Sequence, residues 1–81
     1  MRVPRGLSGE RLARSPVPLG YEETRQTGSH MRLTTRQHGE HHITIRRHAQ
    51  LRVGTSAAIL ADVARHFDMT REAVVELLFA R

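Results

Sequence analysis

The fold is decided by the stretch Gln26-Thr27-Gly28-Ser29-His30-Met31-Arg32-Leu33-Thr34-Thr35, where a Gly-Ser pair precedes an alternation of polar and apolar residues. This alternation runs from His30 to Arg36 and predicts a β-strand with one buried face. A second alternating run extends from Glu40 to Arg47. The segment Gln37-His38-Gly39 between them suits a three-residue hairpin loop with its glycine in the left-handed conformation. The sequence therefore predicts an antiparallel hairpin at the centre of the domain.

The apolar residues select the register of this hairpin. With a three-residue loop Leu33 faces Ile43 and Met31 faces Ile45, whereas a two-residue loop would place Leu33 opposite Thr44. One face of the sheet is then core and the other is a basic surface that bears histidines. That second face is expected to carry His30, Arg32, Thr34, His42, Thr44 and Arg46, with His30 directly across from Arg46.

A short helix and one more strand are expected before the hairpin. Ser8 is a suitable N-cap for a helix over about residues 9–15. Prolines make the chain irregular over Ser15 to Pro18, and Gly20 ends the segment. Tyr21 to Thr27 contains threonines and alternating charge and predicts a strand with one solvent-exposed face.

Two helices are expected after the hairpin. The first is predicted to be capped by Thr55 and to run to about Phe67, with an apolar stripe made by Ala57, Leu60, Val63, Ala64 and Phe67. The second is predicted to be capped by Thr70, with inward side chains at Ala73, Val74, Leu77 and Leu78. The order α-β-β-β-α-α predicts an α+β fold in which helices cover one face of a three-stranded antiparallel sheet.

The composition indicates one small domain with a polyanionic partner. All thirteen basic residues are arginine, and the formal net charge is +5. Residues 1–52 hold ten arginines against four acidic residues, whereas residues 53–81 hold three against four. The surface that faces a polyanion is therefore expected in the first two-thirds of the chain. We expect residues 1–7 to be a flexible N-terminus and residues 8–81 to form a single domain.

Several classes of protein are excluded. The chain has no cysteine, so disulfides and thiolate zinc sites cannot supplement its core. No apolar run approaches the roughly 20 residues that span a bilayer, and no signal-peptide pattern opens the chain. A cytoplasmic location without membrane contact is expected.

His30 is the candidate catalytic residue. An imidazole can accept and donate a proton near neutral pH. RNA carries its own nucleophile, the 2′-hydroxyl, next to each phosphate, so one histidine beside arginines has chemistry to perform without a metal. The alternative is an ordinary surface histidine in a basic strand.

A second group of histidines lies at the tip of the predicted hairpin. In the selected register His41 and His42 point to opposite faces, so they and His38 do not converge on a metal. A solvated hairpin tip is expected, with no metal site and no cofactor.

Gly28-Ser29-His30-Met31 also matches the remnant of a cleaved affinity tag, and Val3-Pro4-Arg5-Gly6 resembles a protease site. These two segments adjoin in such tags, whereas here more than twenty residues separate them and no histidine run precedes them. Residues 31–35 also continue into a strand pattern. We therefore treat His30 as native.

Residues 59–78 offer a rival interpretation as a helix-turn-helix with a recognition helix at residues 70–79. That helix carries Glu72 and Glu76, the wrong sign for a groove lined by phosphates. Asp68 also stands where such motifs commonly place glycine. Two helices that pack on the core are the simpler reading.

Taken together, these segments resemble the HicA family of toxin–antitoxin mRNA interferases. The resembling segments are Leu7-Ser8-Gly9-Glu10, Leu19-Gly20-Tyr21-Glu22, Arg25-Gln26-Thr27-Gly28-Ser29-His30, His42-Ile43-Thr44-Ile45 followed by Arg47-His48, and Gly54-Thr55 before Ile59-Leu60. The resemblance implies a fold related to double-stranded-RNA-binding domains. It also implies a metal-independent endoribonuclease that cleaves mRNA to arrest growth, with His30 catalytic, and a HicB-type antitoxin that forms a hetero-oligomer with it.

The RNA-binding residues expected on this reading are Ser29, Arg32, Arg36, Arg46 and Arg47. A non-catalytic RNA-binding module on the same fold, and the helix-turn-helix DNA binder, remain alternatives. The chain also departs from the family pattern. Pro16 and Pro18 interrupt a helix that the family keeps continuous, Arg46 replaces a common proline, and Ser56 stands where leucine is usual.

Overall fold

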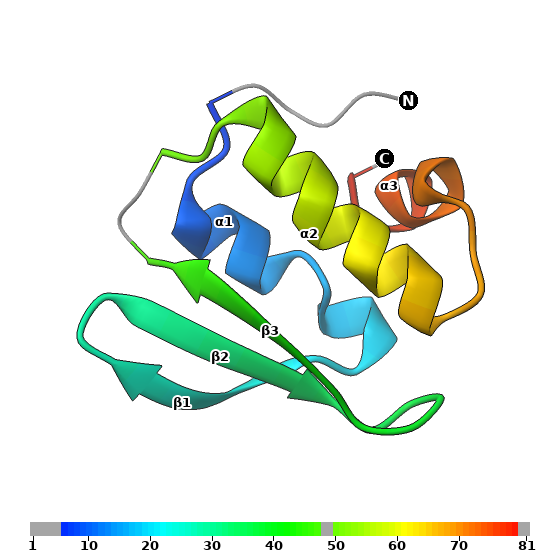
Figure 1. The fold of residues 1–81 in the computed structure, drawn as a ribbon, viewed down its shortest axis with the longest axis horizontal. Coiled ribbons are helices and arrows are strands. Elements are labelled where there is room, and N and C mark those ends of the chain that lie inside the picture. Colours follow the sequence, from blue (N-terminus) through cyan, green and yellow to red (C-terminus); the bar gives the residue numbers. More distant parts are fainter. Residues whose placement is uncertain (1–5, 48–49, 80–81) are drawn as a thin grey trace.

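The computed structural model describes residues 6–47 and 50–79 of the chain and confirms the predicted α+β architecture (Figure 1). The helices and strands follow in the order α-β-β-β-α-α, with a short 3₁₀ turn after the first helix. Their bounds are α1 Gly9–Arg14, η1 Val17–Leu19, β1 Glu22–Thr27, β2 His30–Thr35, β3 His41–Arg46, α2 Val53–His66 and α3 Arg71–Phe79.

The three strands form one antiparallel sheet in the order β1-β2-β3. The β2–β3 register is the predicted one: Leu33 pairs with Ile43 and Met31 with Ile45. Gly39 takes the left-handed conformation expected of the loop, with φ of 93°, and His38 precedes it with φ of 58°. The side chains of the four paired apolar residues are buried, which confirms the core face of the hairpin.

The segment before β1 also folds as predicted. The Ser8 side chain accepts a hydrogen bond from the Arg11 amide at 3.1 Å and caps α1. The chain turns irregular at the prolines, and Gly20 closes η1 with φ of 83°. The buried Thr35 hydroxyl donates to the Leu19 carbonyl at 2.7 Å, which ties this irregular turn to the end of β2.

The packed domain begins before residue 8, the boundary expected from the sequence. Leu7 is 1% exposed and belongs to the core, and its carbonyl accepts from the Leu51 amide at 2.8 Å. Residues 1–5 of the expected flexible segment lie outside the described residues. At Gly9 an added Cβ would lie 1.6 Å from the Arg46 carbonyl oxygen. Only glycine therefore lets α1 approach the end of β3 this closely.

Two expectations for the last helices are wrong. The α2 helix begins at Val53 after an Arg52 N-cap without a side-chain cap, so Thr55 lies inside the first turn and not at the cap. In α3 Val74 is buried and Leu78 packs against the core as expected, but Val75 is buried too, whereas Ala73 is exposed and Leu77 is 48% exposed. The Thr70 cap is confirmed, since its hydroxyl accepts from the Ala73 amide at 3.0 Å.

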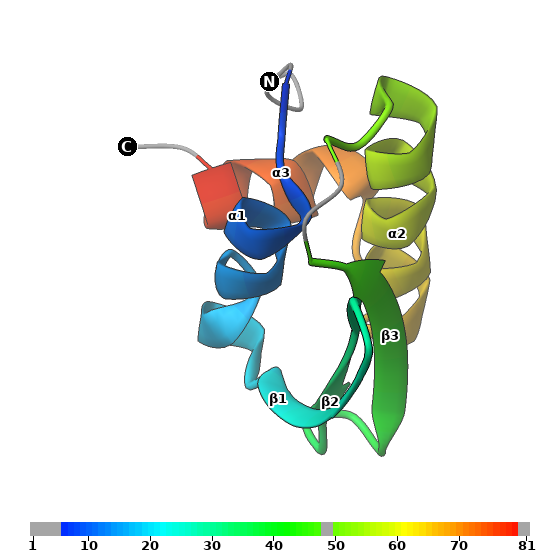
Figure 2. The same cartoon turned by 90° about the vertical axis from the view of Figure 1, so that its left-hand side faces the viewer.

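The helices all lie on one side of the curved sheet, and the other side carries no helix (Figure 2). The core between the layers includes Leu12 of α1, Tyr21 before β1, and the predicted α2 stripe of Leu60, Val63, Ala64 and Phe67, while Ala57 is only partly buried. No helix among the described residues is long and apolar enough to cross a membrane.

Candidate nucleic-acid interface

The uncovered side of the sheet, which we call the outer face, presents His30 at one end of its middle strand. Gly28 takes a left-handed φ of 58°, and the Gly28-Ser29 turn reverses the chain so that His30 opens β2. His30 is exposed and pairs with Thr27 on one side and with Arg46 on the other, the latter as predicted. The histidine therefore stands in the middle strand, flanked by hydrogen-bonding and cationic side chains.

A shallow depression of about 160 Å³ lies at this end of the outer face. It is lined by Arg25, Thr27, His30, Arg32 and Thr44. Of these, Arg25 was missed as a candidate site residue from sequence. The signal existed, because a two-residue Gly-Ser turn sets Thr27 against His30 and hence Arg25 near Arg32. The irregular register between Glu23 and Arg25 obscures that alternation in the sequence.

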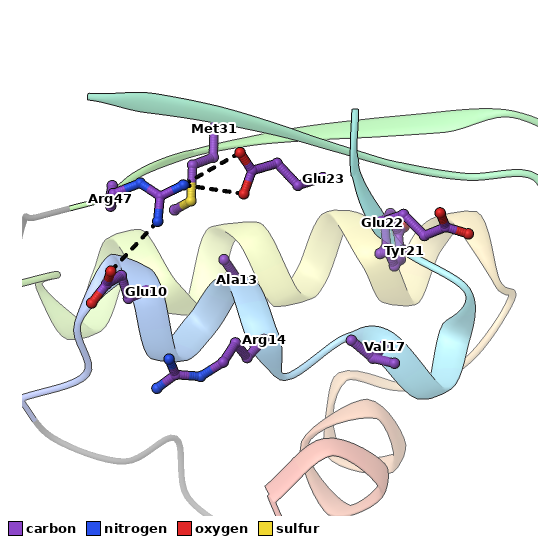
Figure 3. Close-up of a pocket in the computed structure, with 9 residues that line it drawn as sticks. All are labelled: Glu10, Ala13, Arg14, Val17, Tyr21, Glu22, Glu23, Met31 and Arg47. Carbon is purple, nitrogen blue, oxygen red and sulfur yellow. Dashed lines mark hydrogen bonds and ion pairs between the residues drawn. The ribbon is translucent and has the colours of Figure 1, made fainter. Parts of the chain in front are cut away.

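The arginines on the two sides of the sheet differ in whether carboxylates neutralise them. Arg25, Arg32 and Arg46 are exposed on the outer face, and none of them forms an ion pair with a described residue. The structure places Arg47, also expected to contact RNA, on the helix-covered side instead. There it lies 3.1 Å from a Glu23 carboxylate oxygen and 3.5 Å from one of Glu10 (Figure 3).

Arg47 lines a groove of about 370 Å³ between α1 and β1. Its guanidinium also donates to the Gln26 side chain, and its Nε is buried without a partner among the described residues. The groove further includes Ala13, Arg14, Val17 and Met31 (Figure 3). Arg47 is thus a bridge between α1 and β1 and does not share the surface of His30.

The other predicted RNA-binding residues lie at different places. Ser29 is half-buried in the turn, and its carbonyl accepts from the Arg47 amide at 2.6 Å. Arg36 is exposed beyond the far end of β2, beside a depression of about 570 Å³ that Thr24, Thr34 and Gln37 also line. The outer face therefore brings together His30, Arg32 and Arg46, with Arg36 further along the same strand.

A hydrogen-bonded chain of polar side chains crosses the far part of the outer face. The Thr34 hydroxyl lies 2.8 Å from the Thr24 hydroxyl and 2.8 Å from Nδ1 of His42. Nε2 of His42 lies 2.9 Å from a Glu40 carboxylate oxygen. This chain fixes the side chains of three strands and leaves His42 exposed.

His41 faces the helices, so the expectation of a fully solvated hairpin tip is wrong for it. Its Nδ1 lies 2.7 Å from the Tyr21 hydroxyl and its Nε2 3.3 Å from Asp62 of α2. A phenol that donates to Nδ1 leaves the Nε2–H to donate to that carboxylate. Burial, and secondarily the Asp62 charge, raise the pKa of Tyr21 to about 12.

His66 completes this contact between hairpin and helix. Its ring stacks on His41 with centroids 4.4 Å apart. Its Nε2 lies 2.9 Å from the Gln37 carbonyl oxygen and 3.0 Å from that of Gly39. Because both partners are acceptors, Nε2 carries a proton and donates. These histidines hold the hairpin loop on α2. His48 lies outside the described residues.

No group of three or more histidine, aspartate or glutamate side chains in residues 6–47 and 50–79 could hold a metal ion. The helix-turn-helix reading gains one feature, since Asp68 adopts φ of 56° and so fills the place of a glycine. Its recognition helix nevertheless uses Val74 and Val75 for the core and exposes Glu72 and Glu76. The basic surface is on the sheet, away from α3.

Fold and surface thus define a small α+β domain with a basic, histidine-bearing sheet face. The family model for the HicA toxin of bacterial toxin-antitoxin matches residues 12–64, more than half of the 81-residue chain. The chain therefore belongs to the HicA toxin family and is the toxin of a toxin–antitoxin pair, with an antitoxin as partner. No curated protein and no solved structure matches it.

Proposed function

We propose that this toxin is an endoribonuclease that cleaves mRNA on the outer face of its sheet. The observation that carries the proposal is the position of exposed His30 in one depression with Arg32, on a face whose arginines have no carboxylate partners among the described residues. Unpaired arginines attract phosphates, and an exposed imidazole can exchange protons near neutral pH. Membership of a toxin family supplies the cellular setting.

The reaction requires only groups of the RNA, the protein and water. The His30 imidazole takes the proton of a ribose 2′-hydroxyl while the 2′-oxygen bonds to phosphorus. The P–O5′ bond breaks, the departing 5′-oxygen takes a proton from water, and His30 returns its proton to solvent. The products are a 2′,3′-cyclic phosphate and a 5′-hydroxyl. Proton transfer of this kind contributes about 10²- to 10⁴-fold, and arginines stabilise the charge that develops on phosphate oxygens.

Arg46 and Arg36 extend the binding surface beyond this centre. Arg46 lies across from His30 on β3, and Arg36 follows the end of β2, the strand that His30 opens. At about 3.3 Å per residue, the distance along the strand from His30 to Arg36 is about 20 Å, enough for several nucleotides. Ser29 contributes by holding the turn that presents His30. Arg47 has a structural role, because its ion pairs with Glu10 and Glu23 hold α1 against β1 at this end of the sheet.

We further propose that the antitoxin is of the HicB type and that it covers the outer face with acidic side chains. Such a partner would neutralise Arg32 and Arg46 and close access to His30. A structure of the complex in which His30 remains open to solvent would contradict this mode of inhibition.

The experiment that tests the proposed function compares two substrates in the presence of a chelator. One is an all-ribose RNA, and the other has the same sequence with a 2′-deoxynucleotide at every position. We expect cleavage of the first with a cyclic phosphate end, and no cleavage of the second. Binding of both without cleavage of either would instead favour the non-catalytic RNA-binding module.

A further inference from the structure

We propose that Arg25 and Arg32 form a clamp that holds the scissile phosphate beside His30. The inference rests on the ribonuclease function proposed above and adds a residue and a location to it. Arg25 belongs to β1, whereas His30 and Arg32 belong to β2. The reaction centre would therefore lie over the β1–β2 pair, on the opposite side of β2 from Arg46.

The first observation is the pairing of two like charges. Arg25 and Arg32 are direct cross-strand partners in the β1–β2 ladder. Side chains in such positions lie close together, and like charges directly opposite each other destabilise a sheet. Both arginines are exposed, and neither has an ion-pair partner among the described residues. An anion placed between them would remove this repulsion.

The second observation is that carboxylates do neutralise Arg47, the arginine with a structural role on the other side of the sheet. Glu23 lies two residues before Arg25 in β1, yet its carboxylate is on the other side of the sheet at 3.1 Å from Arg47. Glu10 is directed to the same arginine (Figure 3). These two carboxylates thus pair with Arg47, and Arg25 and Arg32 keep two opposed guanidinium groups without an ion-pair partner among the described residues.

The third observation is the shape and lining of the place where the two arginines meet. They share the depression of about 160 Å³ with His30, Thr27 and Thr44. A guanidinium fork matches phosphate oxygens with two parallel hydrogen bonds, and the threonine hydroxyls can donate as well. The ligand class that fits is a phosphodiester, with its non-bridging oxygens toward the arginines and its ribose toward His30.

A clamp on the scissile phosphate predicts an effect on kcat, which a general electrostatic attraction of RNA to the surface does not predict. Charge grows on the non-bridging oxygens in the transition state, so a residue that contacts them affects kcat, and removing one such donor costs about 10²- to 10³-fold. We expect Arg25→Gln to lower kcat by about 10²-fold with little change in KM. Arg25→Lys should be intermediate, because it keeps the charge and loses the fork. Arg71→Gln, which removes the same charge from α3, should cleave normally.

The variant also has an expected signature in stability. Because Arg25→Gln replaces an exposed charged group with a neutral one and removes a like-charge pair, its Tm should equal or exceed that of the wild type. Loss of activity in a fold of undiminished stability separates a role at the phosphate from damage to β1. A lowered Tm together with lowered activity would overturn the assignment.

A second measurement tests the clamp without catalysis. It is a titration with inorganic phosphate in which NMR monitors the chemical shifts of the backbone amides. We expect shifts at Arg25, His30 and Arg32 that disappear in Arg25→Gln and in Arg32→Gln and persist in Arg71→Gln. Absence of these shifts in the wild type, or their persistence in Arg25→Gln, would overturn the clamp.

The two proposals fail in different ways. If the wild type cleaves RNA and Arg25→Gln cleaves with unchanged kcat, the clamp is wrong and the ribonuclease function stands. If the wild type does not cleave RNA but the phosphate shifts follow the pattern above, the phosphate site stands and the ribonuclease function is wrong.

Discussion

Tyr21 is the single tyrosine of the chain, so its titration can be read directly from the absorbance of tyrosinate. It is 2% exposed, its hydroxyl contacts His41, and its pKa is raised to about 12 by burial and by Asp62. A raised pKa means that the fold favours the neutral phenol. This contribution to stability is complete below the unfolded pKa of about 10 and is lost as the pH rises toward about 12.

We therefore expect tyrosinate to form near pH 12 in the folded protein and near pH 10 in denaturant, where the phenol is unperturbed. The free energy of unfolding of the wild type should fall over this interval because Tyr21 ionises more readily in the unfolded state. Tyr21→Phe has no phenol and should not show this part of the fall. Spectrophotometric titration and urea unfolding check these two outcomes. Titration of folded Tyr21 near pH 10 would show that the phenol is not buried as described.

Ser56 shows how one residue can lower the stability of the domain. It is 1% exposed in the first turn of α2, and its hydroxyl has no hydrogen-bond partner among the described residues. A buried polar group without a partner costs about 1–3 kcal/mol. Ser56→Ala removes that group and has the better helix propensity, so it should raise the free energy of unfolding by about 1 kcal/mol. Urea unfolding measures the change, and a loss of stability would indicate a partner for the hydroxyl.

At the level of single residues, the sequence predicted the place of His30 and misassigned an arginine. The alternation that puts Arg46 outward puts Arg47 inward. No pattern in the sequence predicts that the carboxylates of Glu10 and Glu23 both contact Arg47. Those carboxylates come from α1 and β1, and their meeting depends on the tertiary packing of the two elements. Arg25 could have been reached from the two-residue turn, had the strand irregularity been anticipated.

At the level of elements, the β2–β3 hairpin was predictable because its evidence is local. Alternation fixes the faces, and the loop length fixes the pairing. The phase of α3 was not predictable, because Val74-Val75 and Leu77-Leu78 are two adjacent apolar pairs that allow two stripes. Contact with the core selects Val74 and Val75. Likewise, propensity favours Thr55 as a cap, but the helix begins at Val53, just after Leu51 is tied to Leu7.

The neighbours Arg46 and Arg47 test the division between the two sides of the sheet. Arg46→Gln should weaken RNA binding and reduce the salt slope of the binding constant by about one phosphate contact, with stability unchanged. Arg47→Gln should lower the free energy of unfolding by about 1 kcal/mol, the scale of a partly exposed ion-pair network. Its effect on the salt slope should be smaller. Salt-dependent RNA binding and urea unfolding distinguish the pair, and equal salt slopes for both variants would contradict the assignment of faces.

At the level of the whole molecule, the helices and the sheet have separate tasks. The helices supply the core on one side of the sheet, and the other side is left uncovered (Figure 2). Glu10 and Glu23 are paired with Arg47 and Asp62 with Arg65, so these three carboxylates do not neutralise the outer face. The Glu40 carboxylate on that face contacts His42 and none of the described arginines. The domain thereby keeps a concentrated positive surface despite a modest net charge of +5. Such a surface suits both RNA and an acidic antitoxin, which would compete for it.

The catalytic role of His30 is tested by comparing RNA cleavage by His30→Ala with RNA cleavage by His42→Ala, at equal protein concentration and in the presence of a chelator. The two histidines are exposed on the same face, but only His30 lies in the depression with Arg25 and Arg32. We predict that His30→Ala loses at least about 10²-fold in cleavage rate while it keeps its fold and its antitoxin, and that His42→Ala cleaves like the wild type. Cleavage by His30→Ala at the wild-type rate would show that His30 is not the catalytic residue.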